Sequence, residues 1–207
     1  MVFGQLTGRD SLRDLMVSIE PHKPKYYHLG FGKGTSRSNF ANSNEKRDCR
    51  IFEEYAFFLI DVARKSSIVD QDFKLNIDGN IYAFDSTTID LCLSVFWWAK
   101  FRTTKGGIKL HTLYVVNTSI PTFIHVSTAS ENDMNALDLL YYESGGYYIL
   151  DRGYVDYERL FRIHQSSAFF VVRAKDNLQF RRMYSRKFNK DNGVLLDQIG
   201  KLTGYLF

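Results

Sequence analysis

The sequence predicts an α/β protein, in which a mixed sheet of five strands is flanked by helices and preceded by a helical N-terminal region. Two observations support this prediction. Residues 1–75 show helical spacing of apolar side chains and many basic residues, whereas residues 76–207 alternate short β-prone segments with two amphipathic segments. A hydrophobic share of 44% over 207 residues is enough for a substantial core in one full-sized domain.

The N-terminal region predicts three helices. The first has Asp10 as its expected N-cap, Pro21 as its stop, and apolar residues at helical spacing between them: Leu12, Leu15, Met16 and Ile19. The segment GTSRSNFANSN predicts a short helix that opens at Thr35 or Ser36, and residues 50–66 predict a long, largely buried helix. Residues 21–50 hold seven Lys or Arg against two acids, so this region is a candidate DNA-binding surface.

The short helix after Thr35 has two interpretations. It resembles the second helix of a helix-turn-helix, in which Ser36, Arg37 and Asn39 would contact the DNA backbone or base edges. Ser and Asn also serve as helix caps and turn formers, so a purely structural role stays open.

Five segments carry strand-like patterns: residues 80–89, 107–117, 121–128, 146–150 and 168–174. The second and third of these segments are close enough to pair across the turn TSIP. A helix is predicted before the fourth segment, with Ser130 and Asp133 in capping-box spacing. A second helix is predicted before the fifth, with one apolar face formed by Tyr157, Leu160, Phe161 and His164. Neighbouring strands suit an antiparallel meander, and strands reached through helices suit parallel crossovers.

This order matches a ribonuclease H-like sheet, in which the first and fourth strands lie side by side and parallel. Asp85 interrupts the first strand and Asp151 follows the fourth, so their carboxylates are expected to meet. Paired carboxylates suit Mg²⁺ or Mn²⁺, which take oxygen ligands, and two such ions can assist phosphoryl transfer. An Asp after a strand is also a common turn former or N-cap, so the residues alone leave that role open.

A family resemblance covers nearly the whole chain. The segments FDSTTIDLCLSVFWWAKFRTTKGGIKLHTLY, YYILDRGYVDYERL and FFVVRAKDN resemble the DDE transposases of bacterial insertion sequences, of the family whose founding element is numbered four. The resemblance implies a ribonuclease H-like core with Asp85 and Asp151 as the first two catalytic acids, holding two Mg²⁺ or Mn²⁺ ions. It implies as partners the terminal inverted repeats of the element and its target DNA. Val115 departs from the pattern, because an acid is expected after LHTLY.

The family's third acid is a Glu within a Tyr-x2-Arg-x3-Glu-x6-Lys signature, which this sequence lacks. Glu158 is the one Glu after Asp151, and its context is wrong. We therefore expect a fragment, cut short before the third acid and also starting late, with at most residual DNA cleavage. The alternative is a catalytically dead remnant that binds DNA or oligomerises with intact copies, and so inhibits their transposition.

Basic residues near the two acids are candidate DNA contacts. With Arg37, the predicted set comprises Lys100, Arg102, Lys105, Lys109, Arg152, Arg173 and Lys175. For the glycine-containing segment KFRTTKGGIK, a solvated basic loop is the alternative to a phosphate clamp. His111 is expected to be a structural histidine, with metal ligation as the less favoured alternative.

The overall composition sets few limits on the partner. A net charge of +4 permits nucleic-acid binding without requiring it. Cys49 and Cys92 lack metal-binding spacing and predict two reduced thiols in a cytosolic protein. The family resemblance implies a cytoplasmic, nucleoid-associated bacterial protein. No apolar run approaches the length of a membrane span, and no signal peptide is evident.

Overall fold

The computed structural model describes residues 2–66, 77–92, 94, 96–102, 105–189, 191 and 193–203, without the side chains of residues 101, 102 and 105. The chain divides into two compact units, Met1–Leu59 and Ile60–Phe207. The domain boundary predicted between residues 75 and 76 lies outside the described residues.

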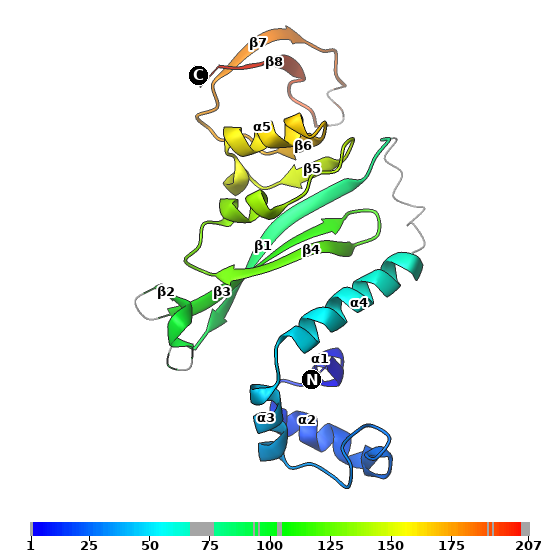
Figure 1. Cartoon of the computed structure of the whole chain (residues 1–207). Helices are drawn as coiled ribbons and strands as arrows, with labels where there is room; N and C mark the ends of the chain where they lie inside the picture. The colour runs from blue at the N-terminus through cyan, green and yellow to red at the C-terminus, as the bar shows by residue number, and fades with distance from the viewer. Residues whose placement is uncertain are drawn as a thin grey trace. The chain divides into compact units, whose positions relative to one another are not determined.

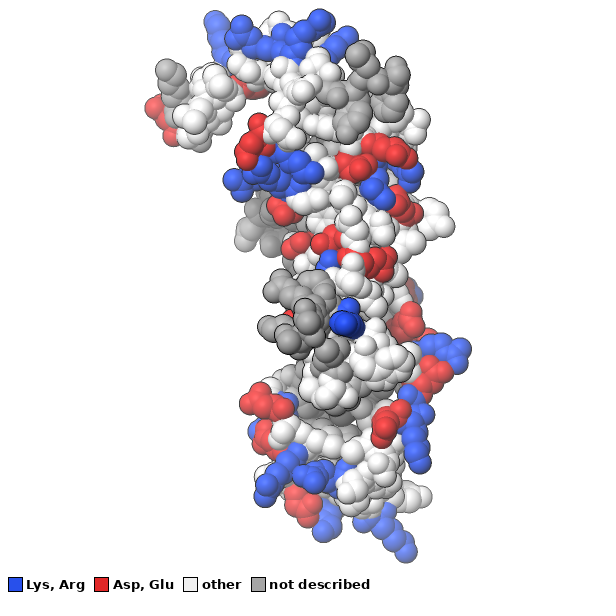
Figure 2. Space-filling model, turned by 90° about the vertical axis from the view of Figure 1, so that its left-hand side faces the viewer, with Lys and Arg blue, Asp and Glu red and all other residues white. Residues whose placement is uncertain are grey.

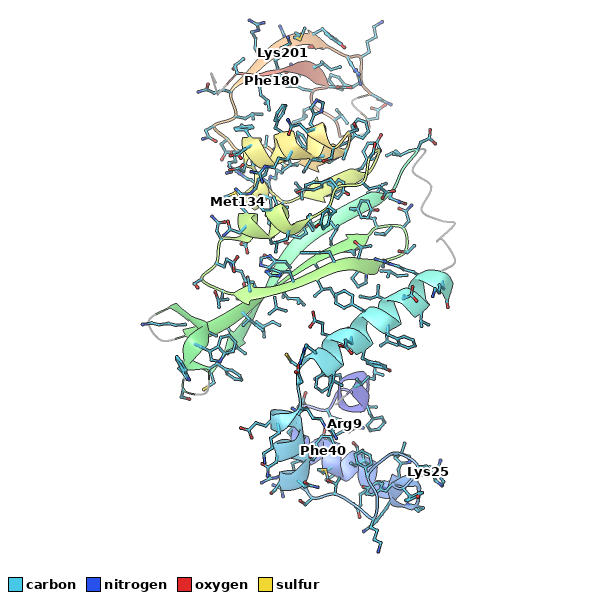
Figure 3. The ribbon with its side chains drawn as sticks, viewed as in Figure 1. Arg9, Lys25, Phe40, Met134, Phe180 and Lys201 are labelled. Atoms are coloured by element: carbon cyan, nitrogen blue, oxygen red, sulfur yellow. The ribbon has the colours of Figure 1, made fainter. Side chains whose placement is uncertain are left out.

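The first unit is helical, as predicted. It contains α1 (Val2–Leu6), α2 (Leu12–Ile19), η1 (Glu20–Lys25), α3 (Arg37–Lys46) and the beginning of α4 (Arg50–Ser66) (Figure 1). Its small core comprises Leu15, Ile19 and Tyr26, against which Phe31 and Phe40 pack. Figure 3 labels Phe40 on α3, with Arg9 and Lys25 in the same unit.

Helix capping in this unit confirms one prediction and corrects another. Ser36 is the N-cap of α3, as predicted, and its side chain accepts a hydrogen bond from the Asn39 backbone N–H at 3.1 Å. The N-cap of α2 is Ser11 and not Asp10, because the Ser11 hydroxyl accepts from the Asp14 N–H at 3.1 Å. The α-helix ends before Pro21 as predicted, and the chain continues as the 3₁₀ helix η1.

The prediction for residues 50–66 is right about the helix and wrong about its burial. Helix α4 begins at Arg50 and ends at Ser66, yet none of its residues is buried. Phe58 is 59% exposed and Ile51 is 53% exposed. Apolar side chains occur around most of the helix, and periodicity alone does not show which of them are covered.

The second unit is built on one mixed sheet (Figure 1). Its strands are β1 (Ile81–Leu91), β2 (Lys100–Arg102), β3 (Lys105–Val115), β4 (Ile120–Thr128), β5 (Tyr147–Leu150) and β6 (Phe169–Val172). The order is β2-β3-β1-β5-β6, with β4 also paired to β3. Strand β1 is antiparallel to β3 and parallel to β5, and β5 is parallel to β6, so the predicted topology is confirmed. The short strand β2, which follows η2 (Trp97–Ala99), was not predicted.

The crossovers to β5 and β6 contain η3 (Asp133–Leu139) and α5 (Tyr157–Gln165), and η4 (Arg152–Tyr154) lies between β5 and α5. The first was predicted as an α-helix with a Ser130 and Asp133 capping box. It is a 3₁₀ helix, capped by the Asn132 side chain, which accepts from the Met134 N–H at 3.1 Å. On α5 the buried residues are Leu160 and Ile163. Phe161 and His164, which were predicted to share the apolar face with Leu160, are exposed, so the buried face of the helix differs from the predicted one. The core between sheet and helices includes Phe84, Leu137, Tyr148, Leu150 and Ile163.

His111 lies in this core, on the buried side of β3. It is 1% exposed, and its Nε2 lies 2.9 Å from the Ser127 hydroxyl oxygen. Its Nδ1 has no hydrogen-bond partner among the described residues. The buried ring and its bond to Ser127 fit the expected structural role.

Burial lowers the pKa of His111 below its ordinary value of about 6.5, because the charged ring would lose its hydration. The unfolded chain therefore binds the proton more readily, and this contribution to stability is present above pH ~6.5 and is lost as the pH falls toward the folded-state pKa. We expect the free energy of unfolding to fall more on acidification in the wild-type protein than in His111→Gln. Urea denaturation at several pH values measures this difference. The exposed His164→Gln serves as control. Equal acid sensitivity of wild type and His111→Gln would contradict this prediction.

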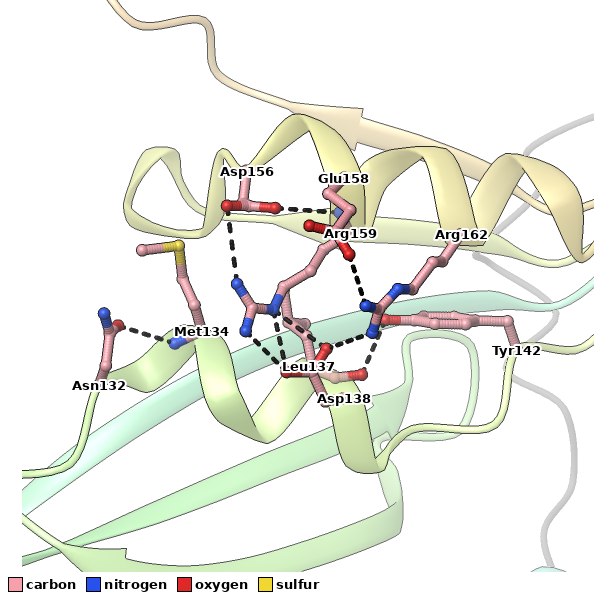
Figure 4. A network of polar contacts seen from close by, with 9 residues as sticks. All are labelled: Asn132, Met134, Leu137, Asp138, Tyr142, Asp156, Glu158, Arg159 and Arg162. Carbon is pink, nitrogen blue, oxygen red and sulfur yellow. Dashed lines mark hydrogen bonds and ion pairs between the residues drawn. The ribbon is translucent and has the colours of Figure 1, made fainter. Parts of the chain in front are cut away.

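An ion-pair network ties η3 to α5 (Figure 4). The Asp138 carboxylate accepts from the Arg159 Nη2 at 2.6 Å and from the Arg162 Nη1 at 2.8 Å. Arg159 also pairs with Asp156 at 3.6 Å, and Arg162 with Glu158 at 2.7 Å. The Asp138 side chain is 35% exposed, so solvent screens the network only in part.

We expect Asp138→Asn to lower the free energy of unfolding by about 1 kcal/mol, because two guanidinium groups lose a shared charged acceptor. Asp61→Asn is the control, because it removes an exposed i,i+4 pair with Lys65 and should change stability by less than about 0.5 kcal/mol. Chemical denaturation of both variants measures the difference. If the two losses are equal, the network contributes no more than a surface pair.

Candidate active site

Two carboxylates are brought together by the pairing of β1 and β5. Phe84 and Leu150 are the last register partners of these parallel strands, and both are buried. Asp85 and Asp151 are the next residue of each chain segment, and both are exposed. The predicted meeting of the two acids therefore follows from a strand pairing that the structure contains.

The two carboxylates have oxygen atoms available for a ligand. Asp85 Oδ1 accepts one hydrogen bond, from the Ser86 backbone N–H at 2.8 Å. Asp151 has the backbone position of an N-cap for η4, but its side chain caps no N–H group. The N-cap alternative is thus not realised at Asp151. Two exposed carboxylates with spare oxygen atoms fit the donor set of Mg²⁺ or Mn²⁺, although no group of three such side chains occurs among the described residues.

A polar cluster beside Asp85 joins β1, β3 and η3. The Ser86 hydroxyl donates to Asp133 Oδ1 at 3.3 Å, and Lys109 Nζ lies 3.0 Å from the same carboxylate oxygen. Lys109 also donates to the Glu131 carbonyl at 2.8 Å, and its side chain is 12% exposed. The sequence signal for Asp133 predicted only a helix-capping role, so its position beside the two acids was missed.

Tyr154 closes the site from the interior. It is 3% exposed, and its ring meets that of Phe84 edge to face with centroids 5.2 Å apart. Burial raises the pKa of the Tyr154 hydroxyl to about 12, and the negative charges of Asp133, Asp85 and Asp151 act in the same direction, while Ser86 opposes the shift. The hydroxyl therefore keeps its proton at neutral pH and lies within the electrostatic reach of all three acids.

The predicted DNA contacts fall into three groups. Lys100, Arg173 and, in the first unit, Arg37 are exposed. Lys109, Arg152 and Lys175 have partners within the fold: Arg152 pairs with Asp176 at 2.5 Å, and Lys175 donates to the Val155 carbonyl at 3.0 Å. The side chains of Arg102 and Lys105 lie outside the described residues, although their strands form the β2–β3 pair.

A basic hairpin follows Lys175, where no strand was predicted. Strand β7 (Phe180–Ser185) pairs antiparallel with β8 (Gln198–Leu202), and Figure 2 shows Lys and Arg side chains gathered over them. The exposed cations of this hairpin surface are Arg181, Arg182, Arg186, Lys187 and Lys201. Phe180 and Lys201 lie on neighbouring strands (Figure 3). Every residue of β7 is exposed. The strand therefore needs no alternation of apolar and polar residues, which is the pattern by which a half-buried strand is predicted.

The register of the hairpin places like charges face to face. Arg181 is the direct cross-strand partner of Lys201, an arrangement that is destabilising unless a negative charge lies nearby. The ring of Phe180 contacts the position where a Cβ on Gly200 would lie, and the Arg181 carbonyl does so too. The aromatic ring of Phe180 therefore covers Gly200 on the neighbouring strand, and the cations of the hairpin lie on its surface.

Comparison with known proteins then identifies the family. Residues 77–205, more than half of the chain, match the family described as Transposase DDE domain. The chain belongs to the DDE transposase family. The mixed sheet around β1 and β5 is consistent with the ribonuclease H-like fold of a DDE transposase domain. Residues 1–32 match a second family, described as a domain of unknown function, DUF4372.

Curated relatives are also named as transposases. A protein of Sinorhizobium fredii, named as transposase y4zB, is 28% identical over 153 residues, which are 74% of this chain and 41% of the relative. A protein of Synechocystis, named as a transposase for insertion sequence element IS4SA, is 24% identical over 78% of this chain and 46% of its own length. A protein of Geobacillus stearothermophilus, named as a transposase for insertion sequence element IS5377, is 30% identical over 49% of this chain and 26% of its own length.

The DDE transposase chain thus spans less than half the length of the curated relatives it matches. No solved structure matches it. Among the residues that the structure describes, none of the helices has the length and apolar character needed to cross a bilayer.

Proposed function

We propose that this chain is part of a DNA transposase that binds the ends of an insertion sequence and holds the first two acids of its metal-dependent cleavage site. The parallel pairing of β1 with β5, which brings Asp85 next to Asp151, is the observation that supports this proposal most directly. The family membership of residues 77–205 supports it independently.

Asp85 and Asp151 are the proposed metal ligands. When bound, a pair of Mg²⁺ or Mn²⁺ ions would stabilise the attacking and leaving oxygen atoms of a phosphodiester. Ser86 fixes the Asp85 carboxylate through its backbone N–H, and Asp133 holds the Ser86 hydroxyl. The Lys109 and Asp133 pair keeps one positive and one negative charge close to the site without using either proposed ligand.

The proposed DNA contacts lie outside the two acids. Lys100 and Arg173 are exposed cations of the second unit, and the hairpin surface of β7 and β8 adds a larger group. Cations on such surfaces bind phosphates, which gives affinity without sequence preference. In the first unit, Arg37 follows the Ser36 N-cap, so α3 could present it to the backbone of a terminal repeat. Ser36 itself and the Asn39 N–H are engaged in the cap.

We further propose that cleavage by these 207 residues is at most residual, because the sequence has no counterpart of the third acid. The same observation favours the second candidate function, an inhibitor that binds element ends or intact transposase copies without cutting. Where the inhibitor acts by binding element ends, the two functions differ only in whether the phosphodiester is broken.

The test is a nicking and retardation assay on a labelled duplex that carries a terminal inverted repeat, in Mg²⁺ or Mn²⁺. Retardation that requires the repeat sequence, with little or no cleavage, is the expected result. Robust cleavage that Asp85→Ala abolishes would show that two acids are enough and would overturn the residual-activity proposal. No retardation at low salt would overturn DNA binding.

A further inference from the structure

One buried polar atom beside the two acids has no partner. The Tyr154 hydroxyl oxygen is inaccessible to solvent and makes no hydrogen bond with any described residue. Its backbone is fixed by the Tyr154 N–H, which donates to the Asp151 carbonyl at 3.0 Å. Its ring is fixed by the edge-to-face contact with Phe84, the residue before Asp85. Both anchors of Tyr154 thus adjoin a proposed metal ligand.

The polar groups around this hydroxyl include acceptors, yet none of them in the described residues forms a hydrogen bond with it. Ser86 is its polar neighbour; the Ser86 hydroxyl donates to Asp133 and keeps acceptor lone pairs, but the geometry contains no hydrogen bond between the two hydroxyls. Asp133 in turn pairs with Lys109. Asp85 and Asp151 act on the hydroxyl through their charge and not through a hydrogen bond. A buried O–H donor without an acceptor costs stability, so its retention in a packed site needs a cause.

We propose that the Tyr154 hydroxyl is a binding group of the two-acid site and donates a hydrogen bond to an oxygen atom that enters this site with its ligand. The oxygen belongs to a water that arrives with a divalent cation or to a phosphate of bound DNA. The inference rests on the proposed function, since it needs Asp85 and Asp151 to hold a cation. Tyr154 would then orient that oxygen, while Phe84 and the η4 backbone keep the ring in place.

A purely structural tyrosine predicts a different outcome. In that case the hydroxyl would turn to the Ser86 oxygen, and its removal would lower stability while ligand binding stayed unchanged. Removal of an unpartnered buried hydroxyl should instead leave stability equal or higher.

The experiment compares Tyr154→Phe with Tyr26→Phe, in the full 207-residue chain. Tyr26 is a matched control, because it is also 3% exposed with an unpartnered buried hydroxyl, and it belongs to the core of the first unit. The melting temperature, Mn²⁺ binding without DNA, and binding of duplex DNA in the presence and absence of Mn²⁺ are measured for each. Asp85→Asn is measured alongside.

We expect both Phe variants to melt at or above the wild-type temperature. If the oxygen is that of a water, Tyr154→Phe weakens Mn²⁺ binding alone by about 3- to 10-fold. If it is a phosphate oxygen, Mn²⁺ binding is unchanged and DNA binding in Mn²⁺ weakens by a similar factor. Tyr26→Phe changes neither.

Two results would overturn the inference about Tyr154. One is a lower melting temperature of Tyr154→Phe with unchanged binding, and the other is binding identical to that of Tyr26→Phe. In both cases, loss of Mn²⁺ binding in Asp85→Asn would leave the two-acid site intact. If Asp85→Asn also binds Mn²⁺ normally, the proposed site itself is wrong and the inference is lost with it.

Discussion

Asp85→Asn is expected to weaken Mn²⁺ binding by at least about 100-fold, since removal of a direct ligand should cost no less than the loss of an outer partner. Asparagine has the shape of aspartate and can still accept the hydrogen bond that the Ser86 N–H donates, so the strand should stay intact. The charge is lost, and hard divalent cations bind carboxylates far better than neutral amides. Asp151→Asn should have a similar effect, because the two acids occupy equivalent positions on β1 and after β5.

Isothermal titration with Mn²⁺ measures this effect, and thermal melting shows whether each variant folds. Asp61→Asn is the control, because this exposed acid pairs with Lys65 and is not a proposed ligand. Normal Mn²⁺ binding by Asp85→Asn and Asp151→Asn would exclude these acids as the cation site. If Asp61→Asn weakened binding equally, the measured binding would be nonspecific attraction to acidic side chains.

The second large effect is expected at the hairpin surface. Replacing Arg181, Arg182, Arg186 and Lys187 by serine should weaken duplex DNA binding by roughly 100-fold at low salt. Each phosphate contact that is lost reduces the salt dependence, so the slope of log affinity against log salt should fall by roughly 3. The cross-strand repulsion between Arg181 and Lys201 also disappears, so the hairpin should not be destabilised.

The matched control keeps the charge, with Arg181, Arg182 and Arg186 all changed to lysine. This variant should retain the wild-type salt slope, because phosphate attraction depends mainly on charge. Fluorescence anisotropy over a series of salt concentrations measures both quantities. A serine variant with an unchanged slope would show that the hairpin surface does not meet DNA.

Local sequence patterns predicted most of the second unit well. The five expected strands and the parallel pairing of β1 with β5 are all present, because apolar alternation and crossover lengths restrict such a sheet to few topologies. The faces were harder to predict. His111 was expected to be a structural histidine, but the groups that enclose it, Ser127 of β4 and Phe84 of β1, could not be read from the sequence.

The amino-acid sequence by itself determined five strands of the mixed sheet and their order along the chain, indicated Asp85 and Asp151 as candidate acids, and indicated the family. These depend on spacing along the chain, which a single sequence contains. The tertiary structure decided what lies around the acids: Asp133 reaches Ser86 from η3, and the Tyr154 hydroxyl is enclosed without a partner. It also decided that Arg181 faces Lys201. Such juxtapositions join residues far apart in sequence, and strand register and side-chain packing, which local patterns do not specify, bring them together.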